Sequence, residues 1–554
     1  MIDIYDIEKF LNEMECISRA TVVTSGDSRC ISIEITLPDL KAPLSFDVDF
    51  DPWYPAKACG EESIHFRNIS LIEYPHIMEQ GRLCLHTISS PDWQEKLTSD
   101  MGQLCEWIQN YYIDKKKDVH FEHLVVKESL INGCYHSFNY ARTTTSFKIG
   151  ECGYVSYNSL MDGVKNGKII KNYIVANYYS RKNINHTPIH TSEFSDFYCS
   201  TDGCAISPYI VIDSIPGNQG KFIFENYLEF ESIISQEQKK HIYESSRLLK
   251  CDLFPLFIGY KIPSGEFAWN AAVIDKNELP TVGYPECING HKTGIWLSRF
   301  VDQPIKWVMT NDISPDFFFG RGCFPTKITG KRILIMGIGA IGSMVAHTLV
   351  RGGCRDISLY DFDIKQPGNV CRSEYDFFCP TNDKKNDLSF ALRRISPYVN
   401  IDSYKNEFDA YVKIASRSNS ELKESIATDF RENYDLIIDC TTDDDVMYAL
   451  EQLDLSIDIV NISISNHAKE LVCAFSPSIY GFVRGVYKDV IKNDSNDIFY
   501  PTGCWNPTFK ASYNDIGAKL QFAIKRMIKM LSGDDLKQNF IITEDANGVH
   551  FQPC

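Results

Sequence analysis

The stretch KRILIMGIGAIGSMVAHTLVRGG, residues 331–353, decides the fold of the second half of the chain. It reads as a short apolar strand, a turn with Gly337, Gly339 and Gly342, and a helix that ends in glycines. The first glycine permits the tight turn, the second lets backbone N–H groups approach a phosphate, and the third lets helix and strand pack closely. The N-terminus of the helix then favours an anion. The sequence therefore predicts a nucleotide site at this turn.

From about residue 301 onward, the sequence pattern predicts strands and helices in alternation. The expected strands after the first one are DISLYDF (356–362), DLIIDCT (435–441), DIVNISISN (458–466) and ELVCAFSP (470–477). This rhythm is typical of a mostly parallel sheet covered by helices. We therefore expect an α/β Rossmann-like domain over residues 301–554.

Asp361 closes the strand that follows the glycine turn, where a carboxylate can accept hydrogen bonds from ribose hydroxyls. To this point, a nicotinamide oxidoreductase explains the pattern as well as an ATP-binding enzyme does. An oxidoreductase has no need for the polar residues that follow, Asn369, Arg372 and Lys385. Arg372 and Lys385 carry the positive charge that a triphosphate requires, and arginine can bind phosphate oxygens in a bidentate manner.

The order Asp361-x-Asp363, Asn369, Arg372, Lys385 resembles the adenylating family of ubiquitin-activating enzymes and their bacterial relatives in thiamine and molybdopterin synthesis. The resemblance covers about residues 331–475 and implies that ATP and Mg²⁺ are used to adenylate a carboxylate. It also implies that an upstream arginine contacts the phosphates across a homodimer. Arg321 is the candidate, although its spacing differs from that of the family.

The metal-linked aspartate that the resemblance implies follows the DCT strand, and here the sequence departs from the family. Thr442 occupies the usual position, so we expect Asp443 to hold the metal, with Asp444 and then Asp439 as alternatives. A solvated acidic loop is the competing interpretation.

Cys504 lies in PTGCWNPTF (501–509), where turn-forming residues favour an exposed loop thiol over a buried one. A thiolate is the nucleophile that could take an acyl group from an adenylate. The segment resembles the GC-x-x-PTF segment of bacterial activating enzymes, which implies that Cys504 is an acyl-carrying cysteine.

Cys84 lies in YPHIMEQGRLCLH (74–86), with Trp93 nine residues beyond it. This order resembles ubiquitin-conjugating enzymes over about residues 1–115 and implies a second acyl-carrying cysteine. The family has an asparagine where this chain has His76, eight residues before the cysteine. We expect His76 to donate the hydrogen bond that the asparagine donates, with a plain loop residue as the alternative. His86 is a further candidate for tuning the thiol.

Residues 1–120 are expected to form one α+β domain. Apolar residues recur at helical spacing over residues 4–14, LSFDVDF (44–50) alternates as a half-buried strand does, and Met101, Leu104, Ile108 and Tyr111 share one helical face. Aromatic, strand-like runs broken by glycine, proline and asparagine fill residues 121–300, which we expect to be a folded, mixed α/β linker domain rather than a flexible tether.

The composition excludes several classes of protein. The 554 residues carry a formal net charge of −17, which argues against a broad nucleic-acid or anionic-membrane surface. No run of eighteen apolar residues and no secretory signal is present, so a cytoplasmic protein is expected. The 19 cysteines include no C-x-x-C pair, so most are expected to be reduced, buried thiols rather than zinc ligands.

A conjugating-like domain ahead of an activating-like domain resembles the ancillary ubiquitin-transferase-like proteins of CBASS antiphage systems. The resemblance implies that the donor is the C-terminal tail of a cyclic-nucleotide synthase (CD-NTase), that the acceptor is an amine on a target protein, that the activating domain forms a homodimer, and that a JAB-type peptidase reverses the reaction. Alternatives are an adenylase for a sulfur carrier or another ubiquitin-like protein, a nicotinamide oxidoreductase, and a binding scaffold with degenerate sites.

Overall fold

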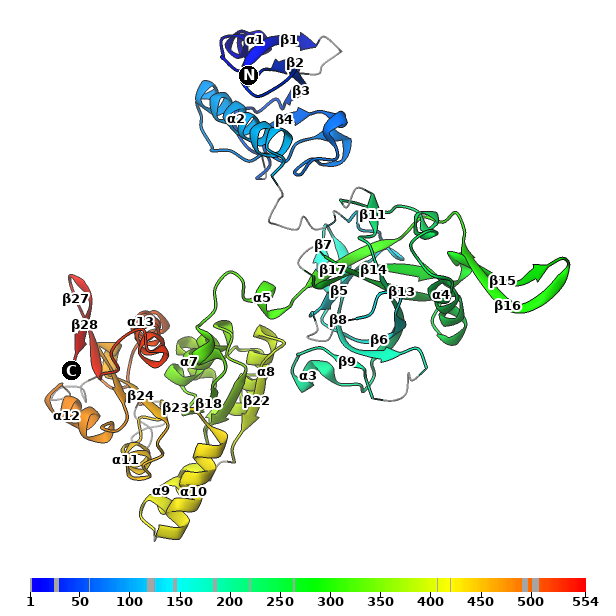
Figure 1. The fold of residues 1–554 in the computed structure, drawn as a ribbon. Coiled ribbons are helices and arrows are strands. Elements are labelled where there is room, and N and C mark those ends of the chain that lie inside the picture. Colours follow the sequence, from blue (N-terminus) through cyan, green and yellow to red (C-terminus); the bar gives the residue numbers. More distant parts are fainter. Residues whose placement is uncertain are drawn as a thin grey trace.

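The computed structural model describes residues 2–23, 29–58, 60–116, 124, 126–142, 147–182, 187–218, 221–262, 265–405, 407–418, 420–490, 497–500 and 508–554. Its main sheets follow one another along the chain, and each has its own hydrophobic core (Figure 1). Among the described residues, none of the helices is both long and apolar enough to cross a membrane.

The N-terminal unit packs two helices against an antiparallel sheet in the order β1-β2-β3-β4. Its elements are α1 (Ile4–Asn12), β1 (Ile17–Val23), β2 (Cys30–Ile35), β3 (Leu44–Phe50), β4 (Ile64–Arg67), α2 (Trp93–Trp107) and a π-helical turn (Ile108–Ile113). Asp3 begins α1 by accepting a hydrogen bond from the Tyr5 N–H at 3.0 Å. Phe46, Val48 and Phe50 alternate into the core, which confirms the strand predicted there.

The middle unit is built mainly from strands. Its elements are β5 (Tyr135–Tyr140), β6 (Cys152–Ser159), β7 (Gly163–Lys165), β8 (Lys168–Ser180), β9 (His190–Thr191), α3 (Asp196–Cys199), β10 (Ala205–Ile212), β11 (Gly217–Asn218), β12 (Phe222–Ile223), α4 (Gln236–Leu248), β13 (Leu253–Lys261), β14 (Phe267–Asp275), β15 (Thr281–Ile288), β16 (His291–Phe300) and β17 (Trp307–Asp312). β15 and β16 form a separate hairpin that projects from the unit (Figure 1).

The large sheet of this unit closes on itself. The strand order is β5-β17-β14-β13-β10-β6-β8, and β8 pairs in parallel with β5, so these seven strands form a barrel. Rings from non-neighbouring strands meet inside it: Phe138 lies 5.1 Å from Phe257, and Tyr178 lies 5.4 Å from Trp269. The aromatic runs of the sequence therefore fill a barrel interior.

The third unit contains an eight-stranded sheet in the order β22-β19-β18-β23-β24-β25-β27-β28. Its elements are α5 (Pro315–Phe318), α6 (Thr326–Thr329), β18 (Arg332–Met336), α7 (Ala340–Arg351), β19 (Asp356–Tyr360), β20 (Ile364–Lys365), β21 (Asn382–Asp383), α8 (Lys384–Ile395), β22 (Asn400–Ser403), α9 (Phe408–Ser416), α10 (Ser420–Asn433), β23 (Leu436–Asp439), α11 (Asp444–Gln452), β24 (Asp458–Ile464), β25 (Glu470–Phe475), α12 (Tyr480–Val490), α13 (Tyr513–Ser532), β27 (Phe540–Asp545) and β28 (Gly548–Pro553).

Strands β22, β19, β18, β23 and β24 are parallel, and β25, β27 and β28 continue the sheet in antiparallel fashion. Ile333 and Ile335 face one core with α7, α8 and α13, while Leu334 and Met336 face the other core with α9 and α11. The predicted Rossmann-like α/β fold is confirmed. Both faces are covered, which explains why β18 reads as an unbroken apolar run.

The barrel extends further along the chain than residue 300, where we expected the linker domain to end. β17 pairs with β14 and with β5, so residues 307–312 belong to the barrel sheet. The first residues of the third unit are those of α5.

Candidate active site

The glycine turn between β18 and α7 brings the backbone into close contact with the end of β23. Gly337 has a φ of +77°, and a Cβ there would lie 2.7 Å from backbone atoms of Thr441. A Cβ at Gly342 would lie 2.0 Å from the carbonyl oxygen of Gly337. A Cβ at Gly339 would meet nothing within 4 Å, because this glycine borders open space. The three glycines thus border different surroundings, which are backbone atoms at Gly337 and Gly342 and open space at Gly339.

Asp361 lies directly after β19, and its carboxylate binds the backbone beside the glycine turn. Its carboxylate is 7% exposed and accepts hydrogen bonds from the backbone N–H groups of Ile338, at 3.0 Å, and Asp363, at 2.8 Å. Burial raises the pKa of Asp361, and the Lys384 ammonium, 3.5 Å away, opposes that shift. Asp363, rather than Asp361, is among the residues that line the adjoining cavity.

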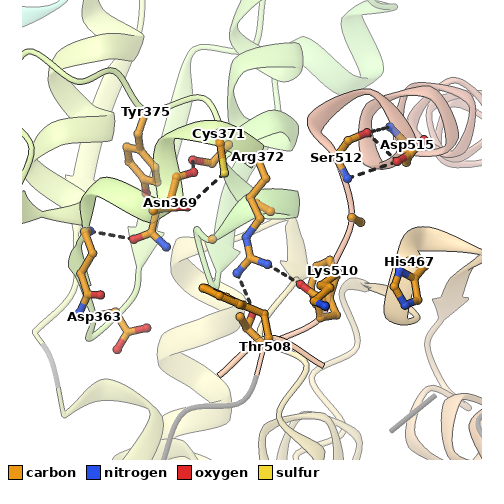
Figure 2. A pocket seen from close by; sticks show the side chains of 18 of the residues that line it. Asp363, Asn369, Cys371, Arg372, Tyr375, His467, Thr508, Lys510, Ser512 and Asp515 are labelled. Atoms are coloured by element: carbon orange, nitrogen blue, oxygen red, sulfur yellow. Dashed lines mark hydrogen bonds between the residues drawn. The ribbon is translucent and has the colours of Figure 1, made fainter. Parts of the chain in front are cut away.

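That cavity has a volume of about 710 Å³ and opens beside the N-terminus of α7 (Figure 2). The residues that line it come from the glycine turn, the segment after β19, the start of α8, the turn between β24 and β25, Phe499, and the segment that leads into the first turn of α13. They are Gly339, Ala340, Asp363, Gln366, Gly368, Asn369, Cys371, Arg372, Ser373, Tyr375, Lys384, His467, Phe499, Thr508, Phe509, Lys510, Ala511, Ser512 and Asp515. The volume lies within the range of small-molecule sites.

Two of the predicted residues, Asn369 and Arg372, lie on one short 3₁₀ segment at the cavity wall. Asn369 Oδ1 accepts a hydrogen bond from the Gln366 N–H at 2.8 Å. The Arg372 guanidinium donates to the Phe509 carbonyl and to the Thr508 hydroxyl, each at 2.7 Å, and stacks over the Phe509 ring (Figure 2). Burial lowers the pKa of Arg372, and a guanidinium stays protonated in proteins. Arg372 therefore joins the glycine-turn half of the site to the segment that follows Cys504.

Lys384, the residue before the predicted Lys385, lines the cavity. Its Nζ is 3.0 Å from Asp363 Oδ2 and 3.5 Å from Asp361 Oδ1. Lys385 is buried, with its Nζ 3.9 Å from Asp383 Oδ2, and does not line the cavity. Sequence reasoning missed Lys384, although two consecutive lysines at a helix start were the signal that could have found it.

Arg321 is exposed in the connection between α5 and α6 and does not line the cavity. Within the described chain, Arg321 makes no hydrogen bond or ion pair with the residues that line the cavity. Its expected role across a dimer remains a prediction.

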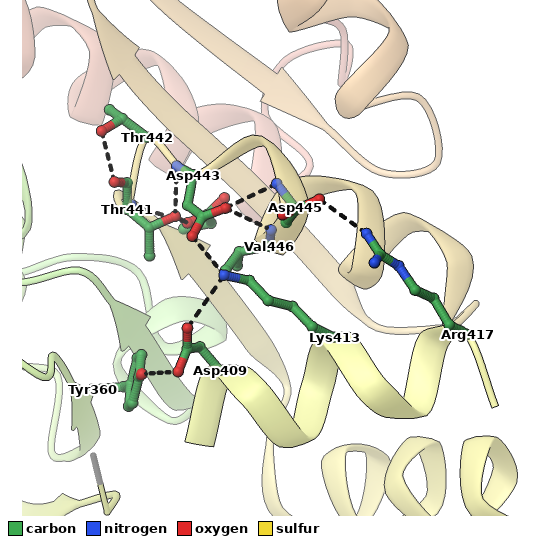
Figure 3. Close-up of polar contacts among 10 residues, drawn as sticks. Tyr360, Asp409, Lys413, Arg417, Thr441, Thr442, Asp443, Asp445 and Val446 are labelled. Carbon is green, nitrogen blue, oxygen red and sulfur yellow. Dashed lines mark hydrogen bonds and ion pairs between the residues drawn. The ribbon is translucent and has the colours of Figure 1, made fainter. Parts of the chain in front are cut away.

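The acidic residues after β23 accept hydrogen bonds from nearby backbone N–H groups and pair with basic side chains (Figure 3). Asp443 caps α11: its Oδ1 accepts from the N–H groups of Asp445, at 2.8 Å, and Val446, at 3.2 Å. Its Oδ2 lies 2.7 Å from the Nζ of Lys413 on α9. Both oxygens of Asp443 thus have partners, and Mg²⁺ could bind this carboxylate only in competition with Lys413. Among the described residues, no group of three or more potential metal ligands is found.

The two alternative aspartates are also engaged. Asp439 is fully buried, accepts from Thr441 and from Asn461 Nδ2, and has its pKa raised by burial. Asp444 is exposed and forms an ion pair with Arg484.

Cys504 lies outside the described residues, so its prediction stands without a structural description. Cys84 is exposed, and its N–H donates to the carbonyl of His76 at 2.8 Å. His76 has a φ of +59°, and its Nε2 lies 3.1 Å from the Tyr111 hydroxyl. The main chain of His76 therefore meets Cys84, while its ring is directed to the π-helical turn after α2.

Comparison with known proteins gives a match to the ThiF family over residues 317–486. The ATP-dependent ubiquitin transferase-like protein Cap2 of Enterobacter hormaechei is 30% identical over 222 residues, which cover 39% of this chain and 35% of the relative. The molybdopterin-synthase adenylyltransferase of Haemophilus influenzae is 24% identical over 127 residues, 23% of this chain and 46% of the relative. This chain thus spans less than half the length of either curated relative.

Among solved structures, Escherichia coli MccB with ATP is similar at 14% identity and a TM-score of 0.29, over 41% of this chain and 64% of that one. The matched residues 317–486 contain the glycine turn, Asp361, Arg372 and Lys384. The chain therefore carries a ThiF-family domain, and it resembles the ubiquitin transferase-like protein Cap2.

Proposed function

We propose that this chain adenylates the C-terminal carboxylate of a donor protein with ATP, carries the acyl group on Cys504 and then Cys84, and conjugates it to an amine on a target protein. The observation that carries the proposal is the cavity where the glycine turn, Arg372 and Lys384 meet Thr508. In the sequence, Cys504 lies four residues before Thr508.

In the activation step, an oxygen of the donor carboxylate bonds to the α-phosphorus of ATP as the bond to the β-phosphate breaks and pyrophosphate leaves. The backbone around Gly339 and the N-terminus of α7 suit phosphate oxygens, and Arg372 and Lys384 supply positive charge beside them. Mg²⁺ bound with ATP would neutralise charge on the departing pyrophosphate.

In the transfer steps, the Cys504 sulfur bonds to the acyl carbon and releases AMP. The Cys84 sulfur then bonds to the same carbon and releases Cys504, and finally an amine displaces Cys84 to form an amide. The N-terminal α+β unit, with an exposed Cys84 held against the main chain of His76, supports a conjugating-like role for this unit.

The similarity to Cap2 supports a protein partner with a free C-terminal tail, and we propose a CD-NTase as the donor. A homodimer in which Arg321 reaches the partner's nucleotide, and removal of the product by a JAB-type peptidase, complete the proposal. A donor from another operon, such as a sulfur carrier or ubiquitin-like protein, would use the same cavity.

ATP–pyrophosphate exchange tests the activation step. Purified full-length protein with a candidate donor should incorporate labelled pyrophosphate into ATP, and a donor lacking its last residues should not support exchange. Binding of a nicotinamide cofactor without exchange would instead favour the oxidoreductase alternative.

Non-reducing gels test the transfer steps. Cys504→Ala should keep pyrophosphate exchange and form no thioester, whereas Cys84→Ala should keep one thioester, on Cys504, and form no conjugate. Normal conjugation by Cys84→Ala contradicts the two-cysteine relay, and failure of any variant to trap a thioester with ATP favours a binding scaffold.

A further inference from the structure

His86 lies between the exposed thiol and a buried carboxylate. Its Nε2 is 3.7 Å from Cys84 Sγ, and its Nδ1 is 3.9 Å from Glu62 Oε1. The His86 side chain is 71% exposed, so it contributes little to the core of the N-terminal unit. Its two ring nitrogens thus face a nucleophile on one side and an anion on the other.

Glu62 is fixed in place although it carries charge. It is 6% exposed and is contacted by Lys57 Nζ at 2.7 Å, by Lys96 Nζ at 3.0 Å and by the Thr87 N–H at 3.0 Å. Burial raises the pKa of Glu62, but these three partners together bring it below its ordinary value. The carboxylate that His86 faces is therefore ionised at neutral pH.

Lys96 anchors this arrangement to α2. Its side chain is fully buried and also forms an ion pair with Asp100, which accepts a hydrogen bond from the Tyr54 hydroxyl at 3.1 Å. Thr87, the residue after His86, donates its hydroxyl to the same Asp100. The network therefore fixes both Thr87, the residue after His86, and the Glu62 carboxylate.

We propose that His86 is a catalytic residue that takes the proton of the Cys84 thiol, and that Glu62 is the positioning residue that orients the imidazole. The order thiol, imidazole, carboxylate is the one that activates nucleophiles in cysteine enzymes. An imidazolium favours the thiolate form of a neighbouring thiol. The use of this thiolate in acyl transfer rests on the proposed function.

The proton and the bonds can be followed through the transfer. The Cys84 S–H proton passes to His86 Nε2, and the Cys84 sulfur bonds to the acyl carbon of the incoming thioester. The bond from that carbon to the donor sulfur breaks, and the departing thiolate takes the proton back from His86. No oxidant, reductant or further reactant is needed.

The reactivity of Cys84 toward iodoacetamide tests the proposal in the full chain, without ATP or a donor. Trypsin cleaves after Arg82, and the peptide Leu83–Lys96 contains Cys84 as its single cysteine, so mass spectrometry reads this site alone. The rate is measured between pH 6 and 9 for wild type and for His86→Gln. The matched control is His550→Gln, which alters another exposed histidine beside a carboxylate, Asp545 at 2.8 Å.

We expect wild type and His550→Gln to react at pH 6.5 about tenfold faster than His86→Gln, whose rate should rise with pH as an ordinary thiol does. Glu62→Gln should show an intermediate profile. Within the described chain, Glu62 faces His86, Lys57 and Lys96 contact Glu62, Asp100 pairs with Lys96, and the carbonyl of His76 accepts from the Cys84 N–H. Unfolding curves check that the variants keep their fold.

Equal rates and equal pH profiles for wild type and His86→Gln would overturn the proposal. Because alkylation requires neither adenylation nor a donor, that result would leave the proposed function standing. Conversely, the expected shift of the pH profile without any ATP-dependent thioester would contradict the proposed function and support the proposed role of His86.

Discussion

Gly339 immediately precedes α7 and Gly342 lies in its first turn, and the two border different surroundings, open space in one case and the Gly337 carbonyl in the other. We expect Gly342→Ala to lower the melting temperature by a few degrees, because the added methyl overpacks backbone at a cost of about 1–3 kcal/mol. Gly339→Ala should keep the melting temperature and raise the half-saturating ATP concentration about tenfold, since its methyl enters the cavity. Calorimetry and pyrophosphate exchange measure the two effects, and a Gly339→Ala variant with unchanged ATP dependence would place the phosphates elsewhere.

Lys384 and Lys385 form a matched pair for testing the cavity. Lys384→Met removes the cation next to Asp361 and Asp363, so we expect weaker ATP binding, by about tenfold or more, measured by nucleotide titration. Lys385→Met changes a buried lysine outside the cavity and should act mainly on stability. The reverse result would show that the spacing in the sequence identifies the phosphate-binding lysine better than the geometry does.

The residue spacing points to Lys385, and the cavity is lined by the neighbouring Lys384. Adjacent residues at the start of a helix point about 100° apart, so counting along the chain cannot distinguish Lys384 from Lys385. Lys413 and Glu62 could not be predicted at all. Their partners, Asp443 and His86, lie 30 and 24 positions away in the sequence and are brought to them only by the packing of α9 and of the segment before β4.

At the scale of elements, α9 places Lys413 against Asp443, with the Lys413 Nζ 2.7 Å from Asp443 Oδ2. Lys413→Met should leave Asp443 open to a cation, so pyrophosphate exchange should reach half of its maximum at a lower concentration of free Mg²⁺. Arg417→Met is the control, because Arg417 pairs with Asp445 at the end of the same helix while both side chains stay largely exposed. An identical Mg²⁺ dependence in all three proteins would mean that Asp443 is a helix cap and not a metal ligand.

Helix α4 carries a buried histidine against the barrel. His241 Nε2 lies 2.8 Å from the Gly153 carbonyl, and burial lowers the pKa of His241 to about 4. The unfolded chain, with a histidine pKa near 6.5, therefore binds a proton before the folded chain does, and stability is lost as the pH falls from about 6.5 to about 4. The loss approaches ~3 kcal/mol at its acid limit.

Hydrogen exchange in strands β6 and β10 measures this effect, with faster exchange expected at pH 5 than at pH 7 after correction for intrinsic rates. His241→Gln can still donate to the Gly153 carbonyl but does not titrate in this range. The variant should lose most of that pH dependence, and a wild-type profile in it would assign the acid sensitivity to another group.

The strands of the middle unit could be predicted from aromatic runs and turn residues, but the barrel could not. Its closure depends on β5 pairing with β8, strands separated by two others in the sequence, and local alternation contains no information on that pairing. In the third unit the glycine turn and the βαβ rhythm are local, and there the sequence was sufficient for the fold class, although not for strands β22, β27 and β28.

At the scale of the whole molecule, one side chain links the barrel to the Cys84 region. Lys221, beside β12, donates its ammonium to the carbonyls of Ile72, at 3.2 Å, and Tyr74. Lys221→Met should speed hydrogen exchange in residues 72–77 and slow conjugation more than it slows pyrophosphate exchange. Lys168→Met, an exposed lysine on β8, is the control. Unchanged exchange in residues 72–77 would show that the contact does not hold this segment.

Because β5 and β17 pair in parallel, they set the distance between the two points at which the neighbouring units join the barrel. The chain enters the barrel at the start of β5 and leaves it at the end of β17, so the N-terminal unit and the ThiF-family domain are tethered to opposite ends of two neighbouring strands (Figure 1). Six residues at 3.3 Å each make this spacer about 20 Å long. In the proposed relay, the rate of acyl transfer between Cys504 and Cys84 would then depend on their effective concentration, which the length of the donor's tail and any second copy within reach would set.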